Sequence, residues 1–294
     1  GCGRIASTFD KNQLTQDIAT HAGAYTKSPR TQLCAAADID TAKLAAFKET
    51  WEPNAVYTDY REMLQKEPID ILSICTWNDT HRQIVADAAE TNVKAIFCEK
   101  PLSVSLQEAD EMIRICRTRG IILAVNHFRR WDLFHQNLKK CLDEGMIGSI
   151  SKIACFYTKG IANTCSHLFD LLRYFFGNAQ WVWAYDNALT TDKDPTMDIY
   201  LAFPKGIQAS VLGCQNIDYR IFEIDILGTH GRIKIHNGFT MELFLSGPSP
   251  RTSEFKELLA QPAPLSDGRK GYFLNAIEDI VSCIEHKRTP LCSG

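Results

Sequence analysis

The stretch Gly1-Cys2-Gly3-Arg4-Ile5-Ala6, with the pattern G-x-G-x-x-A, decides the fold. In such a loop the first Gly permits a tight turn, the second lets a pyrophosphate approach the backbone, and the small third residue lets a helix pack on a strand. A helix that follows the loop directs its N-terminal N–H groups at the phosphates. The pattern predicts a dinucleotide-binding loop, although three small residues at this spacing also occur in ordinary tight turns.

A loop of this kind normally follows a β-strand, and no residue precedes Gly1 in the sequence. We therefore expect the first strand to be missing and the chain to be a fragment of a longer protein. That strand is ordinarily central in the sheet, so two neighbouring strands would lack a partner. Because unpaired backbone groups are costly, we expect an isolated protein of this sequence to aggregate or to fold only in part.

Short apolar runs alternate with helical patterns as far as residue 126. The apolar runs occupy residues 32–38, 70–76, 95–98 and 121–125, and the helical patterns occupy residues 7–21, 41–50, 81–91 and 106–119. Buried strands between amphipathic helices are typical of a parallel sheet that is covered on both faces. The sequence predicts an α/β fold, with a Rossmann-type doubly wound parallel sheet over residues 1–126.

The pattern changes after residue 126. Helices are predicted at 131–144, 166–176 and 271–286, a half-exposed strand at 151–158, further strands across 181–245, and a turn-rich excursion at 248–268. This succession predicts a C-terminal α+β domain over residues 127–294, built on a large, mostly antiparallel open sheet. We expect the final helix, 271–286, to pack back towards the first domain.

Composition and charge exclude several classes of protein. The 294 residues are 45% hydrophobic and 23% charged, with a net charge of −3, so nucleic acid or an anionic membrane is not expected as the main partner. No apolar run is long enough to span a bilayer. The 11 Cys form no C-x-x-C pair, so no metal site is predicted. Scattered thiols fit a reducing cytoplasm.

Asp38 ends the first predicted apolar run, residues 32–38. A carboxylate at this place can accept hydrogen bonds from the ribose hydroxyls of an adenosine, and it repels a 2′-phosphate. The next residue is Ile39 rather than Arg, so the sequence favours NAD over NADP. Alternatively, Asp38 only caps the helix that begins near Thr41, a role that Asp40 could fill equally well.

Glu99-Lys100-Pro101 follows the third predicted strand. Ligands of open α/β sheets bind at the carboxyl ends of the strands, which is where this tripeptide is predicted to lie. A Lys there could donate a hydrogen bond to a substrate oxygen. Without further context, a solvated surface ion pair is the better interpretation.

Taken together, the motifs resemble those of the Gfo/Idh/MocA oxidoreductase family, which includes glucose–fructose oxidoreductase and inositol dehydrogenase. The resemblance covers essentially the whole chain. Beside the segments above, it rests on Thr76-Trp77-Asn78-Asp79-Thr80-His81, Val125-Asn126-His127-Phe128-Arg129-Arg130-Trp131-Asp132, His167-Leu168-Phe169-Asp170 and Gly228-Thr229-His230-Gly231-Arg232-Ile233.

The resemblance implies roles for individual residues. Lys100 would lie between nicotinamide and substrate, and His167 would take the hydroxyl proton, oriented by Asp170 one helical turn on. The family often has Asp four residues before this His, where this chain has Asn163. A carboxylate that would raise the basicity of His167 or join a proton relay is therefore missing here. The cofactor-binding residues are expected to be Gly1, Gly3, Arg4, Ile5, Asp38, Thr76, Trp77, Asn78, His81, Glu99, Lys100 and Asn126.

The implied activity is transfer of a hydride between NAD and a secondary alcohol of a sugar, cyclitol or nucleotide-sugar. Two alternatives stay open: a glycosidase that recycles bound NAD, and a non-catalytic dinucleotide-binding sensor. Family members commonly form homo-oligomers through the outer face of the C-terminal sheet. The aromatic set Trp181, Trp183, Tyr185 and Tyr200 is interpreted as sheet core or subunit interface rather than a sugar platform.

Overall fold

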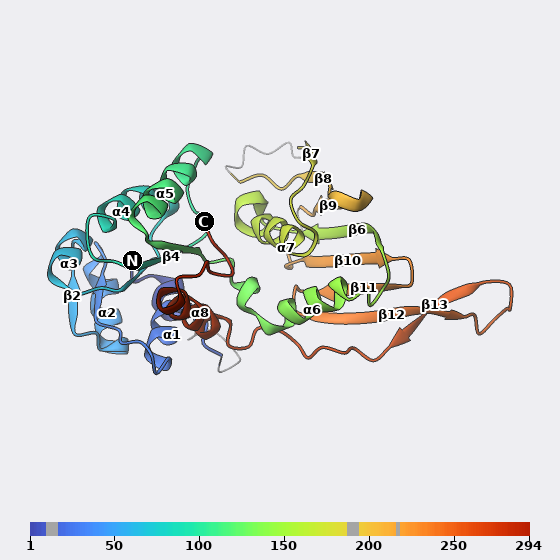
Figure 1. Ribbon diagram of the computed structural model, residues 1–294, viewed down its shortest axis with the longest axis horizontal. Helices are drawn as coiled ribbons and strands as arrows, with labels where there is room; N and C mark the ends of the chain where they lie inside the picture. The colour runs from blue at the N-terminus through green and yellow to red at the C-terminus, as the bar shows by residue number, and fades with distance from the viewer. Residues whose placement is uncertain (10–16, 187–193, 216–217) are drawn as a thin grey trace. The chain divides into compact units, whose positions relative to one another are not determined.

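The computed structural model describes residues 1–9, 17–186, 194–215 and 218–294. The chain divides into two compact units (Figure 1). Unit 1 comprises Gly1–Asp132 and Lys270–Gly294, and unit 2 comprises Leu133–Arg269. Each unit has hydrophobic core clusters of its own.

Unit 1 contains two parallel sheets. β1 (Ala35–Ala37) pairs with β2 (Ala55–Tyr57), while β3 (Ile71–Ile74), β4 (Ala95–Cys98) and β5 (Ile122–Val125) form a second sheet in that order. In the described part of the chain, the β1–β2 pair is not joined to the β3–β4–β5 sheet. The parallel pairing confirms the α/β class of this half.

Helices cover both faces of the three-stranded sheet (Figure 1). Ile96 and Cys98 of β4 belong to the same core cluster as residues of α4 and α5, whereas the alternate residues Ala95 and Phe97 belong to the cluster of α1 and α8. A strand that is buried on both faces reads as a continuous apolar run, as β4 does. The helices of unit 1 are α1 (His21–Lys27), α2 (Thr41–Trp51), α3 (Tyr60–Lys66), α4 (His81–Ala88), α5 (Leu106–Arg119) and α8 (Tyr272–His286).

The predicted helix at 7–21 is wrong at its described end. Residues 17–20 are not helical, and α1 begins only at His21. The reason is the N-cap: Thr20 has an extended backbone, and its Oγ1 accepts a hydrogen bond from the N–H of Gly23 at 3.1 Å. The middle of the predicted helix, 10–16, lies outside the described residues. β2 and α3 were not predicted from the sequence, and they are only 3 and 7 residues long.

Unit 2 is built on an eight-stranded sheet with the order β13-β12-β11-β10-β6-β9-β8-β7. Only the β6–β9 pair is parallel among these described strands, which confirms a mostly antiparallel sheet. The strands are β6 (Ile150–Tyr157), β7 (Trp181–Tyr185), β8 (Asp198–Ala202), β9 (Gln208–Gly213), β10 (Phe222–Gly228), β11 (Gly231–His236), β12 (Thr240–Pro248) and β13 (Lys256–Gln261).

β13 corrects the prediction of a turn-rich excursion over 248–268. This strand pairs antiparallel with β12, from Leu243↔Gln261 to Pro248↔Lys256. It lies at the sheet edge and has no fully buried residue, so it lacks the apolar alternation that marks a core strand.

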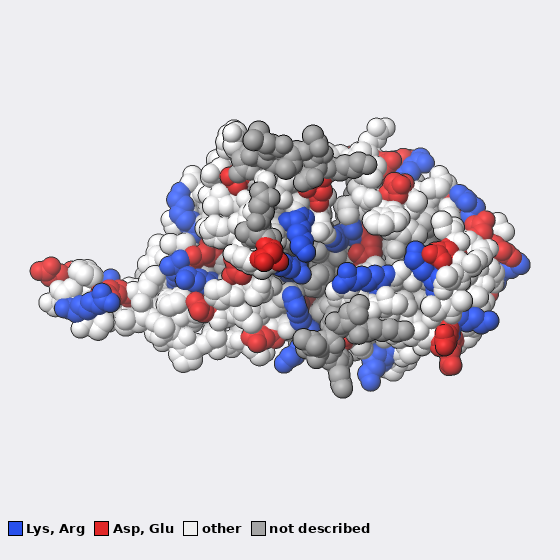
Figure 2. Space-filling model, turned by 180° about the vertical axis from the view of Figure 1, so that it is seen from behind, with Lys and Arg blue, Asp and Glu red and all other residues white. Residues whose placement is uncertain are grey.

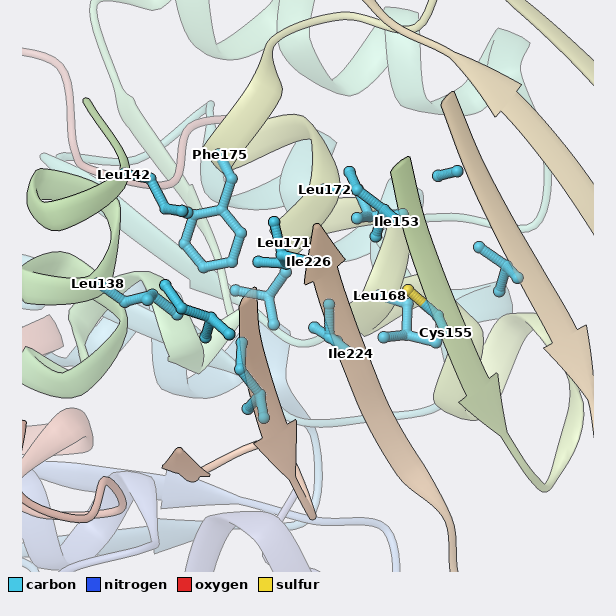
Figure 3. Close-up of a cluster of buried hydrophobic side chains, with 14 of the residues drawn as sticks. Leu138, Leu142, Ile153, Cys155, Leu168, Leu171, Leu172, Phe175, Ile224 and Ile226 are labelled. Atoms are coloured by element: carbon cyan, nitrogen blue, oxygen red, sulfur yellow. The ribbon is translucent and has the colours of Figure 1, made fainter. Parts of the chain in front are cut away.

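One face of the sheet is covered by α6 (Leu133–Asp143) and α7 (Ser166–Phe176). Figure 3 shows side chains of both helices meeting those of β6 and β10 in a single apolar cluster, among them Leu138, Leu172, Ile153 and Ile224. The packing explains the alternation of buried and half-buried residues along β10 and β11, since only one side of each strand faces the helices.

The opposite face of this sheet carries exposed aromatic residues. The exposed fraction is 51% for Trp181, 54% for Trp183, 55% for Tyr185 and 38% for Tyr200. The interpretation of these residues as sheet core is therefore wrong. Trp183 and Tyr200 are direct cross-strand partners, and alternation places Trp181 and Tyr185 on the same face.

Acidic and basic side chains are interspersed over each unit on the face that Figure 2 shows. Among the described residues, no helix combines the length and the apolar character that crossing a bilayer requires. All 11 Cys are free thiols.

Candidate functional site

The G-x-G-x-x-A loop lies between the carboxyl ends of β1 and β3. Cys2 donates its backbone N–H to Asp38 after β1, at 2.6 Å, while a Cβ added to Gly1 would lie 2.8 Å from the carbonyl oxygen of Cys75 after β3. Gly1 is therefore fixed by a close approach of backbone to backbone. A Cβ on Gly3, in contrast, would have no atom of the other described residues within 4 Å. Within the described part of the chain, this side of Gly3 is open, as a loop that admits a pyrophosphate requires.

Ala6, the third small residue of the loop, is buried, with an exposed fraction of 4%. It lies in a π-helical turn, η1 (Arg4–Thr8), in which Ser7 donates its N–H to the carbonyl of Gly3 at 3.0 Å. Ile5 is partly buried against the cluster of α1 and α8. Arg4 is exposed, with its guanidinium 4.7 Å from the centre of the Phe9 ring.

Asp38 connects the strand end to the loop. Its Oδ2 accepts the N–H of Cys2 at 2.6 Å, and its Oδ1 accepts the N–H of Asp40 at 2.9 Å. The cap of α2 is Asp40, whose carboxylate accepts the N–H groups of Ala42 and Lys43. The alternative in which Asp38 merely caps this helix is therefore wrong. Each carboxylate oxygen of Asp38 keeps a further lone pair for a ribose hydroxyl.

The segment from Thr76 to His81 follows β3. Trp77 is 84% exposed, and Asn78 opens a 3₁₀ turn, η3 (Asn78–Thr80). His81 is buried, with Nε2 3.1 Å from the carbonyl oxygen of Thr76 and Nδ1 3.1 Å from that of Leu102. In this structure the His81 ring links the two loops that follow β3 and β4.

Glu99, Lys100 and Asn126 meet at the carboxyl ends of β4 and β5. The Oε1 of Glu99 accepts a hydrogen bond from Nδ2 of Asn126 at 2.6 Å, and its Oε2 accepts the backbone N–H of Lys100 at 3.3 Å. Glu99 is 8% exposed, so it is not half of a solvated surface pair. The peptide bond between Lys100 and Pro101 is cis.

A third partner of Glu99, His21, was not predicted from the sequence. The Nε2 of His21 lies 2.9 Å from Oε1 of Glu99, and its Nδ1 lies 2.9 Å from Oγ of Ser73. Ser73 is also bonded to the hydroxyl of Tyr25 at 2.9 Å. No local motif marks His21, because its partners come from strands that lie far along the chain.

Electrostatics favour an ion pair between His21 and Glu99. Burial disfavours the charged form of His21, but the facing Cys75 and Glu99 outweigh burial and raise the pKa of the imidazole above its ordinary value. Burial likewise acts to raise the pKa of Glu99, yet bonds from His21 and Asn126 lower it below its ordinary value. Both shifts favour the charged forms.

The remaining predicted residues belong to unit 2. His167 is the second residue of α7 and is 8% exposed, and Asp170 follows it by three residues on the same helix. Asn163 lies in the π-helical turn η5 (Gly160–Cys165), which leads into α7.

A carboxylate that the sequence analysis missed binds this turn. Asp194 accepts the backbone N–H of Ala162 through Oδ1 at 2.7 Å and that of Asn163 through Oδ2 at 3.0 Å. The Asp194 carboxylate therefore lies against the backbone of Asn163, the position at which the family often has Asp. Its distance in sequence from the turn, 31 residues for the Asn163 bond, explains why no motif revealed it.

The residues of unit 1 fit a bound dinucleotide. Gly3 lies on the glycine-rich loop, and the Asp38 carboxylate at the end of β1 is bonded to that loop through the N–H of Cys2, so sites for a pyrophosphate and an adenosine ribose lie side by side. Asn126 is 3% exposed, and its Oδ1 has no hydrogen-bond partner among the residues that the structure describes. A buried amide oxygen without a partner is costly, so a donor such as a carboxamide N–H would stabilise it. The described residues hold no group of three or more potential metal ligands.

Comparison with known proteins identifies the family. Residues 17–127 match the family described as "Oxidoreductase family, NAD-binding Rossmann fold", and residues 159–234 match the "GFO/IDH/MocA C-terminal domain". The chain belongs to the GFO/IDH/MocA family. It is therefore an oxidoreductase with an NAD-binding Rossmann fold, and the resemblance inferred from the motifs is confirmed.

Two curated relatives illustrate the similarity of this GFO/IDH/MocA chain. It is 28% identical to the uncharacterized oxidoreductase YrbE of Bacillus subtilis over 74% of this chain and 70% of that protein. It is 26% identical to the myo-inositol 2-dehydrogenase of Thermotoga maritima over 81% of this chain and 74% of that protein.

Solved structures show the same fold. The WlbA dehydrogenase of Bordetella pertussis, in complex with NADH and UDP-GlcNAcA, superimposes with a TM-score of 0.77 at 20% identity, over 100% of this chain and 89% of that one. A putative NADPH-dependent oxidoreductase of Desulfitobacterium hafniense has a TM-score of 0.78 at 18% identity, over 92% of this chain and 85% of that one. The fold of this GFO/IDH/MocA member is thus shared by structures whose descriptions name different cofactors.

Proposed function

We propose that this chain is an NAD(H)-dependent dehydrogenase that acts on a secondary alcohol of a sugar, cyclitol or nucleotide-sugar. The observation that carries the proposal is the arrangement at the ends of β4 and β5. There Lys100 directly follows a buried carboxylate that three donors hold in place, in the unit that contains the dinucleotide loop.

The cofactor would be held by the loop from Gly1 to Ala6 and by Asp38, with the segment from Thr76 to His81 beside its ribose and phosphates. When bound, NAD supplies the hydride acceptor for the oxidation of an alcohol. Asp38 favours NAD over NADP, because its carboxylate repels a 2′-phosphate and accepts hydrogen bonds from ribose hydroxyls.

Two residues would carry the acid–base chemistry. Lys100 donates a hydrogen bond to the substrate oxygen and stabilises the negative charge that develops there. His167 accepts the hydroxyl proton as general base, and Asp170, one turn along α7, orients its ring. The family resemblance supports these roles, together with the burial of His167.

A glycosidase that recycles bound NAD and a non-catalytic sensor are not favoured. The Thermotoga maritima relative is named as a dehydrogenase, and the chain has both Lys100 and His167. We place the enzyme in a reducing cytoplasm, which agrees with its 11 free thiols.

The test is a substrate screen with the purified chain, NAD and a panel of myo-inositol, scyllo-inositol, aldoses and UDP-sugars. We expect NADH to form with one member of the panel, and Lys100→Met to slow that turnover by roughly 10²–10³. Lys66→Met is the matched control, because this exposed Lys forms an ion pair with Glu62 on its own helix. If NAD binds but no member of the panel yields NADH, the proposed activity is wrong.

We also propose that the chain forms a homo-oligomer through the exposed face of the unit 2 sheet. Trp183 stacks against Tyr185 with ring centres 6.1 Å apart and lies 5.5 Å from the ring of Tyr200. Phe156 of β6, 39% exposed, extends this aromatic surface across the sheet. Aromatic residues that gather on an open face are typical of an interface.

A further inference from the structure

We propose that His21 is a positioning residue that fixes Lys100 by holding the Glu99 carboxylate against the backbone N–H of Lys100. The inference deepens the proposed function, since it assumes that Lys100 contacts the substrate. His21 belongs to no motif of the sequence, and its place in the site follows only from the structure.

Hydrogen bonds fix the geometry of the Glu99 side chain. Its carboxylate receives three donors: the ring of His21 at 2.9 Å, the amide of Asn126 at 2.6 Å and the backbone N–H of Lys100 at 3.3 Å. The first two bind the same oxygen, Oε1, which leaves Oε2 directed at the backbone of Lys100. The rotamer of Glu99 therefore determines where the β4 end places the following residue.

The start of α1 and two aromatic rings hold His21 in position. It is the first residue of α1, and the Oγ1 of its neighbour Thr20 caps this helix. His21 is 2% exposed, and its ring lies between Phe97 of β4, with ring centres 4.7 Å apart, and Phe273 of α8, at 5.0 Å. Aromatic rings pack on the imidazole and both of its nitrogens have partners, so its orientation is fixed. The Glu99 carboxylate that it binds is fixed in the same way.

The pairing of Glu99 with His21 also balances a buried charge. A carboxylate with an exposed fraction of 8% is costly unless it is paired. The imidazolium of His21 supplies an opposite charge at 2.9 Å from Oε1 of Glu99. The other polar groups that face His21 are Ser73, through Nδ1, and Cys75.

Packing alone would give a different outcome on substitution. A histidine that only fills space between Phe97 and Phe273 can be replaced by Leu at a cost in stability without a selective effect at Lys100. A positioning histidine, in contrast, requires a donor at Nε2. Gln can place its amide nitrogen near that point and restore the hydrogen bond without restoring the charge.

The experiment compares His21→Leu and His21→Gln with Ile280→Ala. Ile280 lies in the same core cluster and is fully buried, but it has no part in the hydrogen-bond network, so it reports the effect of lost stability alone. Three quantities are measured on the full chain: the Kd for NAD, hydrogen–deuterium exchange of peptides that cover residues 98–103, and kcat on the substrate found in the screen.

We expect His21→Leu to lower kcat by about 10²-fold, the usual cost of misplacing a group by about 1 Å. The Kd for NAD should change less than about threefold, and exchange over residues 98–103 should become faster. His21→Gln should recover most of kcat and of the protection, although the charge is lost. Ile280→Ala should lower the melting temperature without faster exchange specific to residues 98–103.

Three results would overturn the proposal. One is unchanged exchange at 98–103 in His21→Leu, which is decisive even when no substrate is known. The second is normal kcat in that variant. The third is a loss of kcat that His21→Gln does not recover and that Ile280→Ala reproduces at equal stability. A wild-type chain that binds NAD but oxidises no substrate would instead contradict the proposed function, while the exchange measurement still tests the position of Lys100.

Discussion

The sheets of the two units differ in which of their surfaces can meet a ligand. The three-stranded sheet of unit 1 is covered on both faces, and every residue of β4 is buried. The buried polar side chains Glu99 and Asn126 lie where its strands end. In the sheet of unit 2, α6 and α7 cover one face, and Trp183 and its neighbours are exposed on the other face among the described residues.

The comparison indicates that chemistry and association use different parts of a sheet. A covered sheet offers only its carboxyl edge, where loops can aim side chains and backbone N–H groups at a small molecule. A half-covered sheet offers a broad apolar surface, which suits a protein partner. Substitutions at strand ends and helix starts should thus alter turnover and cofactor affinity, whereas substitutions on the open face should alter assembly.

The largest effect is expected for His167→Ala. If His167 is the general base, kcat should fall by about 10²–10⁴, the usual contribution of a positioned base, while the Kd for NAD stays nearly constant. Steady-state kinetics and a cofactor titration measure the two quantities. His230→Ala is the control, since this His lies in the turn between β10 and β11. Near-normal kcat in His167→Ala would assign a structural role to His167 and require another route for the proton.

Asp38→Ala should have the next largest effect, on cofactor affinity. Each charge-assisted hydrogen bond lost to the ribose is worth roughly 1.5–3 kcal/mol, so the Kd for NAD should rise at least about tenfold. Discrimination against NADP should shrink as well, because the repelling carboxylate is gone.

Asp40→Ala is the matched control for this prediction. It removes the cap of α2, at a cost of about 1 kcal/mol in stability, but leaves Asp38 in place. We therefore expect Asp40→Ala to melt earlier and to bind NAD normally. Equal affinity of the wild-type chain for NAD and NADP would contradict the role given to Asp38.

Most of the fold could be predicted from the sequence, for a physical reason. The α5 helix (Leu106–Arg119) and the β4 strand (Ala95–Cys98) have the predicted bounds. A long amphipathic period indicates a helix, and a continuous apolar run indicates a buried strand, from the sequence alone. In contrast, β13 and the start of α1 were not predicted. An exposed edge strand has little alternation, and a single capping Thr decides where α1 begins.

The candidate site was predictable only in part. Motif residues such as Asp38 and Lys100 carry a local signature, whereas His21 and Asp194 act through partners 78 and 31 residues away. Long-range pairs of this kind appear only once the chain is folded, and a lone His or Asp gives no sign of them. The roles of the predicted site residues stay predictions until variants are measured.

A smaller effect is expected for Asn163→Asp. Asp194 already places a carboxylate against the backbone N–H of Asn163, so a second carboxylate in this turn would lie close to a like charge. The new side chain should shift the pH dependence of kcat/KM without a large change in its maximum. The matched variant Asp194→Asn should loosen the turn and lower kcat. An unchanged pH profile in Asn163→Asp would show that this position takes no part in proton transfer.

The smallest effect on catalysis, and a clear one on assembly, is expected for Trp183→Glu. If the open face of the unit 2 sheet joins two copies of the chain, a charge at Trp183 faces the partner's apolar surface and has to be desolvated. Light scattering should then show a smaller mass than for the wild-type chain, with kcat changed less than about threefold. Val182→Glu is the control on the same strand: Val182 is 63% exposed, but alternation along β7 points it away from the aromatic face. If Val182→Glu dissociates the oligomer and Trp183→Glu does not, the interface lies elsewhere, and the contrast between a catalytic edge and an associating face is wrong for this protein.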